Sequence, residues 1–189
     1  LELIEKKHAV NVRPLLERLD QMTNSVSQLL QLARVGQSFT AGNYQQVSLM
    51  RDVIAPMSLE MQAMLQQRGQ TLEVAATQDV TVRGDATLLS VLLRNLLENA
   101  HRYSPKGTVV TVRIENVSGA VLAVEDCGPG IDESKSGELS RAFVRMDSRY
   151  GGIGLGLSIV SRIAQLHKAQ FFLENRPQTG GCRASVKFS

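Results

Sequence analysis

The chain has 189 residues, of which 43% are hydrophobic and 21% charged, so its composition is that of a globular protein rather than a disordered one. Its net charge is only +3, aromatic residues make up 4% and tryptophan is absent, so we expect no nucleic-acid partner. The two cysteines, Cys127 and Cys182, are too few for a disulfide framework or a zinc site and predict free thiols.

The beginning of the chain is expected to form a region of its own. From Leu15 to Ala33, apolar residues recur at alternating spacings of four and three, which is typical of a helix that packs against other helices. A coiled coil or a dimeric four-helix bundle would cover this seam, and packing on the chain's own domain is the alternative. The glycine and hydroxyl residues that follow predict a linker over residues 37–47.

The rest of the chain is expected to mix helices with short strands. Helices are predicted from Ser48 to about Gln67, from Ala86 to about Tyr103 with Asp85 as the N-cap, and over residues 155–166. Pro56 is expected to kink the first helix or to move its start. Strands are predicted at 71–74, 80–83, 108–115, 120–126, 170–175 and 182–188. Because most of these strands would be antiparallel, the order predicts an α+β sandwich rather than a doubly wound sheet.

Polar residues form a stripe on the otherwise apolar helix that starts at Ala86. Asn95, Asn99 and Arg102 are spaced four and three apart, so they share one face. Amide oxygens there could coordinate Mg²⁺, and the arginine could bind the phosphates that this ion bridges. A solvated polar face is the alternative.

A second motif begins where a predicted strand ends. Asp126 follows four apolar residues and Glu125, and Gly128 and Gly130 come directly after it. Because a carboxylate only accepts hydrogen bonds, Asp126 would select a ring with an exocyclic amine, which favours adenine over guanine. A simple turn closed by the aspartate side chain is the alternative.

A third motif is rich in glycine and leads into the last predicted helix. Residues 151–157 read Gly-Gly-Ile-Gly-Leu-Gly-Leu, and glycines before a helix N-terminus expose backbone N–H groups to an anion. The segment is neither a P-loop nor a dinucleotide fingerprint. Arg141, Arg145 and Arg149 precede it at spacings of four, and they could form either a phosphate-facing lid or a solvated face.

In this order, the three motifs resemble those of the histidine kinases of two-component signalling, members of the gyrase, Hsp90, histidine kinase and MutL ATPase superfamily. The matching segments are Asn95 with Asn99-Ala100-His101-Arg102-Tyr103 (N box), Asp126-Cys127-Gly128-Pro129-Gly130 (first glycine box), Phe143-Val144-Arg145 (F box), Gly152-Ile153-Gly154-Leu155-Gly156-Leu157 (second glycine box) and, more loosely, Gly180-Gly181. The resemblance implies a two-layer α/β sandwich of the Bergerat type, preceded by a dimerization helix.

The same resemblance implies roles for individual residues. Asn99 would be the Mg²⁺ ligand, Asn95 would lie on the phosphate side, and Arg102 would contact phosphate where the family usually has lysine. Asp126 would bind the adenine amine. The other residues expected to bind the nucleotide are Tyr103, Gly128, Gly130, Ile131, Arg145, Arg149, Gly152, Gly154, Leu155, Gly156 and Leu157.

Two departures from the family patterns qualify this interpretation. The gyrase and Hsp90 types carry a water-activating glutamate where this chain has Asn95, so we expect ATP to be held for transfer with little hydrolysis. Glu98, beside Asn99, is a candidate for some base role. Moreover, none of His8, His101 and His167 lies in the acceptor pattern His-Glu-x-Arg-Thr-Pro, so we expect the sequence to start downstream of the acceptor.

The resemblance also implies an organisation and partners. Residues 1–36 would be a partial dimerization and phosphotransfer region, and residues 48–189 the catalytic domain. The cofactors would be ATP and Mg²⁺, and the parent protein would be a homodimer at the bacterial inner membrane that phosphorylates a response regulator of the OmpR-like class. The alternatives are a gyrase-like conformational ATPase and a non-catalytic docking module with a vestigial nucleotide site.

Overall fold

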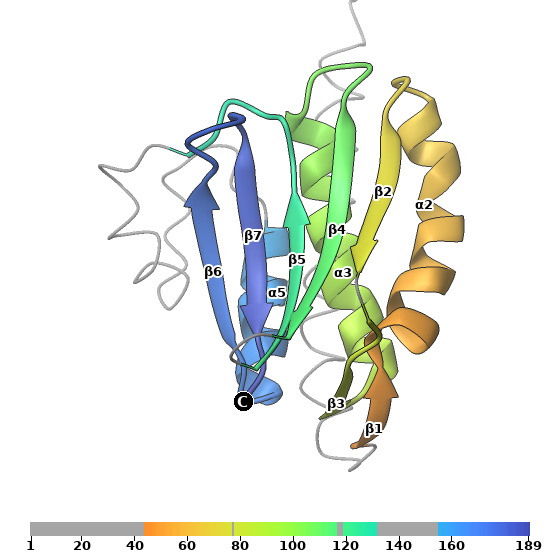
Figure 1. Cartoon of the computed structure of the whole chain (residues 1–189), viewed down its shortest axis with the longest axis vertical. Coiled ribbons are helices and arrows are strands. Elements are labelled where there is room, and N and C mark those ends of the chain that lie inside the picture. Colours follow the sequence, from red (N-terminus) through yellow and green to blue (C-terminus); the bar gives the residue numbers. More distant parts are fainter. Residues whose placement is uncertain (1–43, 77, 117–118, 132–154) are drawn as a thin grey trace, which may run out of the picture.

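The computed structural model describes residues 44–76, 78–116, 119–131 and 155–189, with the side chain of Leu155 left out. The predicted heptad helix and most of the predicted linker lie outside these residues. The described elements form one layer of sheet and one layer of helices, so the predicted two-layer α/β sandwich is confirmed (Figure 1).

The sheet layer is a five-stranded mixed sheet. Its strands, in the spatial order β2-β4-β5-β7-β6, are β2 (Thr71–Ala76), β4 (Val109–Asn116), β5 (Ala120–Glu125), β7 (Cys182–Lys187) and β6 (Gln170–Asn175). β2 and β4 are parallel, and every other neighbouring pair is antiparallel. The C-terminal ends of β5 and β6 and the start of β7 therefore lie at the same edge of the sheet, next to the loop that carries Asp126.

Helices α3 (Ala86–Tyr103) and α5 (Leu155–Leu166) cover one face of this sheet, and α2 (Ala55–Gln66) lies beside α3 (Figure 1). The predicted bounds of α3 and α5 are confirmed. Asp85 is the predicted N-cap of α3, because its Oδ1 accepts hydrogen bonds from the backbone N–H groups of Thr87 at 2.8 Å and Leu88 at 3.1 Å. The apolar face of α3, which includes the fully buried Leu89 and Leu92, packs into the core.

The helix predicted from Ser48 to Gln67 is split in two. Ser48 caps a π-helical segment, η2 (Leu49–Ile54), and α2 begins only at Ala55. Pro56 lies in the first turn of α2, where a missing N–H costs nothing, so it moves the α-helical start as expected. Gly69 follows the helix with φ of +64°, as expected for a C-terminal stop.

A small second sheet lies where the linker was expected to end. β1 (Gln45–Ser48) pairs antiparallel with β3 (Thr81–Gly84), and Val47 is buried. The Tyr44 hydroxyl donates to the carbonyl oxygen of Leu166 at 2.7 Å. Residues 44–47 are therefore part of the folded domain, which begins earlier than residue 48. Within the described residues, no helix is long and apolar enough to cross a membrane.

Candidate functional site

The polar stripe of α3 faces the first turn of α5. Asn95 is buried, and its Nδ2 donates to the carbonyl oxygen of Val91 at 2.8 Å. A Cβ placed on Gly156 would lie 3.0 Å from Asn95 Oδ1 and 3.7 Å from Asn99 Nδ2. The lack of a side chain at Gly156 thus lets the N-terminus of α5 approach both asparagines, which brings the N box and the end of the second glycine box together.

Asn99 carries an unsatisfied group. Its Nδ2 is buried and, among the described residues, has no hydrogen-bond partner. A buried polar atom without a partner costs about 1–3 kcal/mol, so such an atom in a native fold calls for an explanation. Because the amide oxygen and nitrogen are assigned from the surrounding network, a 180° flip would place Oδ1 in the same position, as a ligand for a cation.

Glu98 lies on a different side of α3. Burial raises its pKa, while the nearby charges of Arg94 and Arg102 partly offset that rise and the charge of Glu60 on α2 adds to it. Arg94 in turn pairs with Glu60. These neighbours place Glu98 on the side of the helix that faces α2, whereas Asn95 and Asn99 face α5.

The C-terminal end of α3 is held by residues that follow α2. The side chain of Gln70, 1% exposed, donates from Nε2 to the carbonyl oxygens of His101, Ser104 and Pro105 at 3.1–3.2 Å. Arg68 donates to the carbonyl oxygen of Arg102 at 3.1 Å. These two side chains satisfy carbonyls that a helix end leaves unpaired and fix the turn that carries the exposed Arg102 and Tyr103.

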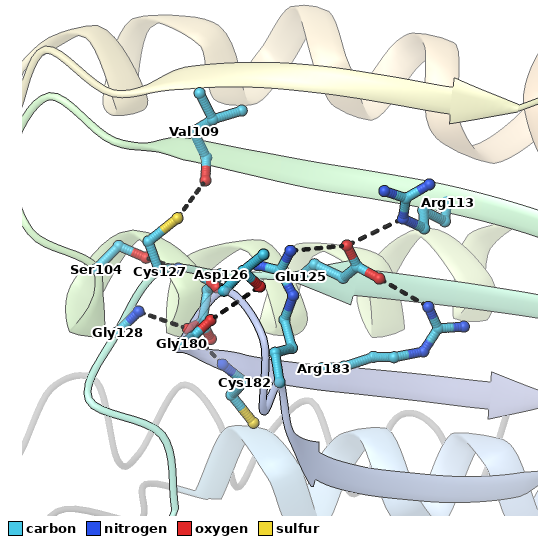
Figure 2. A network of polar contacts seen from close by, with 12 residues as sticks. Ser104, Val109, Arg113, Glu125, Asp126, Cys127, Gly128, Gly180, Cys182 and Arg183 are labelled. Carbon is cyan, nitrogen blue, oxygen red and sulfur yellow. Dashed lines mark hydrogen bonds and ion pairs between the residues drawn. The ribbon is translucent and has the colours of Figure 1, made fainter.

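Asp126 lies at the sheet edge, immediately after β5. Its Oδ1 accepts hydrogen bonds from the backbone N–H groups of Gly128 at 2.8 Å and Cys182 at 3.0 Å (Figure 2). The turn closed by the aspartate side chain therefore exists. Within the described part of the chain, both hydrogen bonds to the carboxylate end on Oδ1, so Oδ2 remains available to a donor from a ligand. The turn and the nucleotide-binding role are compatible.

The loop after Asp126 fits tightly against its neighbours. A Cβ on Gly128 would lie 3.1 Å from the carbonyl oxygen of Tyr103, so the loop lies close to the end of α3. Ile131 donates its N–H to Asn175 Oδ1 at 2.6 Å and accepts from Asn175 Nδ2 at 2.9 Å. Gly130 has φ of +80°, and a Cβ there would meet Asn175 Oδ1 at 2.5 Å. The asparagine at the end of β6 therefore fixes the predicted glycine box.

The turn between β6 and β7 packs against the backbone of Asp126. The sequence did not predict this contact. The Arg176 side chain donates from Nη1 to the Asp126 carbonyl oxygen at 2.8 Å. Gly181 has φ of +87°, and a Cβ there would lie 2.0 Å from the same oxygen. Of the Gly180-Gly181 pair, noted from sequence only as a loose motif, Gly181 thus has a steric reason to be glycine.

Three arginines surround one buried carboxylate at the end of β5. Glu125, 6% exposed, accepts from Arg113 Nε at 2.9 Å and Arg183 Nη1 at 2.7 Å (Figure 2). Arg176 Nη2 lies 3.4 Å from the same carboxylate. Burial opposes the ionisation of Glu125, but the hydrogen bonds from Arg113 and Arg183 outweigh burial and hold its pKa below the ordinary value. The residue is therefore ionised at neutral pH.

The two described histidines are structural. His101 Nδ1 lies 2.6 Å from Gln70 Oε1, and burial together with the charges of Arg68 and Arg102 lowers its pKa. His167 is buried between α5 and the start of α3. Both imidazoles are therefore engaged in contacts within the fold.

Part of the predicted site lies outside the described residues. This holds for Arg145, Arg149, Gly152 and Gly154 and for the whole predicted lid. Leu155 begins α5. Leu157 packs against the core and directly follows Gly156, the residue that lies against the two asparagines. The described site residues therefore form two groups, one of Asn95, Asn99 and Gly156 and the other of Asp126, Gly128, Gly130 and Ile131.

Known proteins share this architecture and these motifs. The profile of the family described as histidine kinase-, DNA gyrase B-, and HSP90-like ATPase matches residues 84–189, more than half of the chain. The chain is 66% identical to the sensor protein BasS of Escherichia coli (strain K12) over 190 residues, which cover 99% of this chain and 52% of BasS. It is 67% identical to sensor protein BasS of Salmonella typhimurium (strain LT2), covering 98% of this chain and 52% of that protein.

A solved structure agrees. The cytoplasmic segment of histidine kinase QseC has a TM-score of 0.62 and 29% identity, covering 90% of this chain and 93% of that one. The chain spans about half the length of the two BasS proteins. It belongs to the histidine kinase-, DNA gyrase B- and HSP90-like ATPase family, and the part that the family profile matches is an ATP-binding catalytic domain of the histidine kinase type.

Proposed function

We propose that this domain binds Mg²⁺-ATP between the asparagine stripe of α3 and the Asp126 loop, and that the whole protein transfers the γ-phosphoryl group to one of its own histidines. The observation that carries the proposal is the buried Asn99 Nδ2, which has no partner in the described part of the chain and lies beside Gly156 at the N-terminus of α5. Among the described residues nothing satisfies this amide; a triphosphate oxygen would accept from Nδ2, and in the flipped orientation Oδ1 would bind a metal ion.

The donor set fits a magnesium ion that is held largely by its substrate. No group of three or more His, Cys, Asp or Glu side chains that could hold a metal occurs among the described residues. Mg²⁺ is commonly bound through one or two protein oxygens together with substrate phosphates and water. Asn99 would supply that oxygen. When bound, the ion would neutralise charge that develops on the phosphates during transfer.

The remaining residues would bind different parts of the nucleotide. Asp126 Oδ2 would accept a hydrogen bond from the adenine amine, with Gly128, Gly130, Ile131 and Tyr103 shaping the surrounding pocket. Arg102 and the first turn of α5, from Leu155 to Leu157, would lie against the phosphates. Arg145, Arg149, Gly152 and Gly154 would complete the phosphate side, and Glu98 stays a candidate for a base role in transfer.

The side chain of Asn95 supports transfer over hydrolysis. Its Nδ2 donates to the carbonyl oxygen of Val91, and an amide does not abstract a proton from water. A gyrase-like conformational ATPase would need a carboxylate at this position. A vestigial docking module is also disfavoured, because the asparagine stripe and the Asp126 loop are both present and built into the fold.

For the whole protein, we propose a homodimeric sensor kinase whose catalytic domain lies on the cytoplasmic side of the bacterial inner membrane. Its partner would be a response regulator of the OmpR-like class. The sequence resembles the polymyxin-resistance sensor kinase PmrB (BasS), which makes PmrA the proposed regulator. Residues 1–36 would supply one dimerization helix.

Calorimetric titration of the 189-residue chain with ATP and GTP, with and without Mg²⁺, tests the site. We expect ATP to bind at least tenfold more tightly than GTP, and Mg²⁺ to strengthen the binding. Equal affinities for the two nucleotides would contradict the role of Asp126. Incubation with γ-labelled ATP is expected to leave the chain unlabelled and to release little phosphate, whereas steady hydrolysis would favour the gyrase-like function.

A further inference from the structure

The backbone of Asp126 is fixed from several directions. Its N–H donates to the Cys182 carbonyl oxygen at 2.9 Å, and its carbonyl oxygen accepts from Arg176 Nη1 at 2.8 Å. The Gly181 backbone packs against the same carbonyl oxygen. The side chain adds the two hydrogen bonds to Oδ1 from Gly128 and Cys182. Among the groups that make these contacts with Asp126, the Arg176 guanidinium alone is a charged side chain.

Arg176 is itself held in place. Its backbone closes the turn between β6 and β7, with its N–H donating to the Gly181 carbonyl oxygen at 3.0 Å and its own carbonyl oxygen accepting from Gly180 at 2.9 Å. Its Nη2 lies 3.4 Å from Glu125 Oε2, and its side chain is 22% exposed. The guanidinium therefore bridges two consecutive residues, the Glu125 carboxylate and the Asp126 carbonyl oxygen.

We infer that Arg176 is a positioning residue for nucleotide selection, and that it directs Asp126 Oδ2 toward the exocyclic amine of adenine by fixing the Asp126 peptide. This inference rests on the proposed function, in which Asp126 reads the base. A rotation of the Asp126 peptide would move its Cα and redirect the carboxylate, and recognition by a single hydrogen bond is sensitive to such a shift. Arg176 would thus affect base discrimination without touching the base.

The chain offers a matched control. Arg113 Nε contacts the same Glu125 Oε2 at 2.9 Å from strand β4, and no contact joins it to Asp126 among the described residues. Removing either guanidinium takes one partner from Glu125 and leaves Arg183 in place. Only the removal of Arg176 also frees the Asp126 carbonyl oxygen.

The test compares ATP with inosine triphosphate (ITP), whose 6-oxo group offers no amine to Asp126. Affinities are measured by calorimetry, with ITP in competition where its binding is weak. For Arg176→Met we expect ATP affinity to fall about tenfold, which is the size of one charge-assisted hydrogen bond, while ITP affinity stays within a factor of two. The ATP-to-ITP preference should then fall about tenfold, and Arg113→Met should keep the preference of the unmodified chain.

An equal loss of both affinities in Arg176→Met would indicate a general structural role and overturn the inference, as would an unchanged preference. Should Arg176→Met not fold, as judged by thermal unfolding, Arg176→Lys carries the test. Lysine presents one nitrogen where arginine presents two, so the carbonyl and the carboxylate would compete for it. The ATP-to-ITP preference of this variant should fall about threefold, and an unchanged preference overturns the inference. If the unmodified chain does not prefer ATP to ITP, the proposed role of Asp126 fails, and the inference fails with it.

Discussion

His167 Nε2 accepts a hydrogen bond from the backbone N–H of Asp85 at 3.1 Å, across 82 positions of sequence. Because Nε2 is the acceptor, the proton of the neutral ring lies on Nδ1, which donates to the Ile163 carbonyl oxygen at 2.8 Å. The ring of Tyr44 lies against the imidazole, with centroids 5.2 Å apart. One side chain therefore joins the end of α5 to the loop that caps α3.

Replacing His167 with leucine is expected to destabilise the domain by about 2 kcal/mol, because the Asp85 N–H would be buried without a partner. Chemical denaturation measures the change, with the exposed Gln165→Leu on the same helix as control. Equal stability of the two variants would show that the bond contributes nothing to the fold.

His167 and His101 predict that the stability of the domain depends on pH. Burial lowers the pKa of His167, and burial with the charges of Arg68 and Arg102 lowers the pKa of His101. The fold therefore favours the neutral form of both imidazoles. Their contribution to the free energy of unfolding is complete above the unfolded histidine pKa of about 6.5, and it is lost as the pH falls below that value toward the lower pKa values of the folded state. We expect the free energy of unfolding to decrease between about pH 6.5 and 5, and the decrease to be smaller in His167→Leu. An identical pH profile for both proteins would refute this assignment.

Replacing Asn99 with alanine is expected to weaken ATP binding without lowering the stability of the domain. Asn99→Ala removes the buried Nδ2 that has no partner among the described residues, so the free energy of unfolding should be unchanged or rise by up to about 1 kcal/mol. Its Mg²⁺-dependent ATP affinity should fall at least tenfold. Calorimetric binding and thermal unfolding measure the two effects. A clear loss of stability would mean that the amide has a structural partner.

Two adjacent glycines predict opposite outcomes. Gly181→Ala places a Cβ 2.0 Å from the Asp126 carbonyl oxygen and must move the Asp126 loop, whereas a Cβ on Gly180 meets nothing within 4 Å. Both have positive φ, so Gly180→Ala should cost about 1 kcal/mol from backbone strain alone. Gly181→Ala should cost more than about 3 kcal/mol or abolish ATP binding. Comparable thermal unfolding and affinity in the two variants would disprove the steric explanation.

Cys182 should resist chemical modification in the folded protein. Burial, with a smaller contribution from the charge of Asp126, raises the pKa of its thiol to about 12, so the reactive thiolate is nearly absent at neutral pH. Cys127 is only half-buried. Iodoacetamide labelling followed by mass spectrometry should modify Cys127 first and Cys182 only after unfolding. Rapid labelling of Cys182 in the native state would be incompatible with this environment.

Local sequence signals predicted the elements that depend on local physics. Asp85 as a cap and the apolar face of α3 were enough to place that helix, and Pro56 indicated a break in the helix before it. The π-helical form of η2 was not predictable from Pro56 alone. Strand β1 was missed because Gln45 and Gln46 carry no apolar alternation, and only pairing with β3 makes this segment a strand.

In the candidate site, too, the residues marked by local spacing were predicted and those that act through long-range contacts were not. The asparagine stripe and Asp126 are visible as motifs because their spacing is local. Asn175 and Arg176 were missed because they act on backbone atoms 44 and 50 positions away, and no sequence pattern marks such contacts. Gln70 was missed for the same reason, since it satisfies carbonyls at the end of a helix that begins 16 positions later.

The hydrogen bond from Tyr44 to Leu166 gives the domain an asymmetric mechanical linkage. A load applied at Tyr44 would act on the end of α5 and, through His167, on the cap of α3, which are the two helices that carry Gly156 and the asparagines. Asp126 is anchored instead to the sheet edge by Cys182 and Arg176. A small pull or twist at this point would therefore move the two helices of the proposed phosphate site relative to the anchored Asp126, changing the reach of a bound triphosphate while the adenine stays in place.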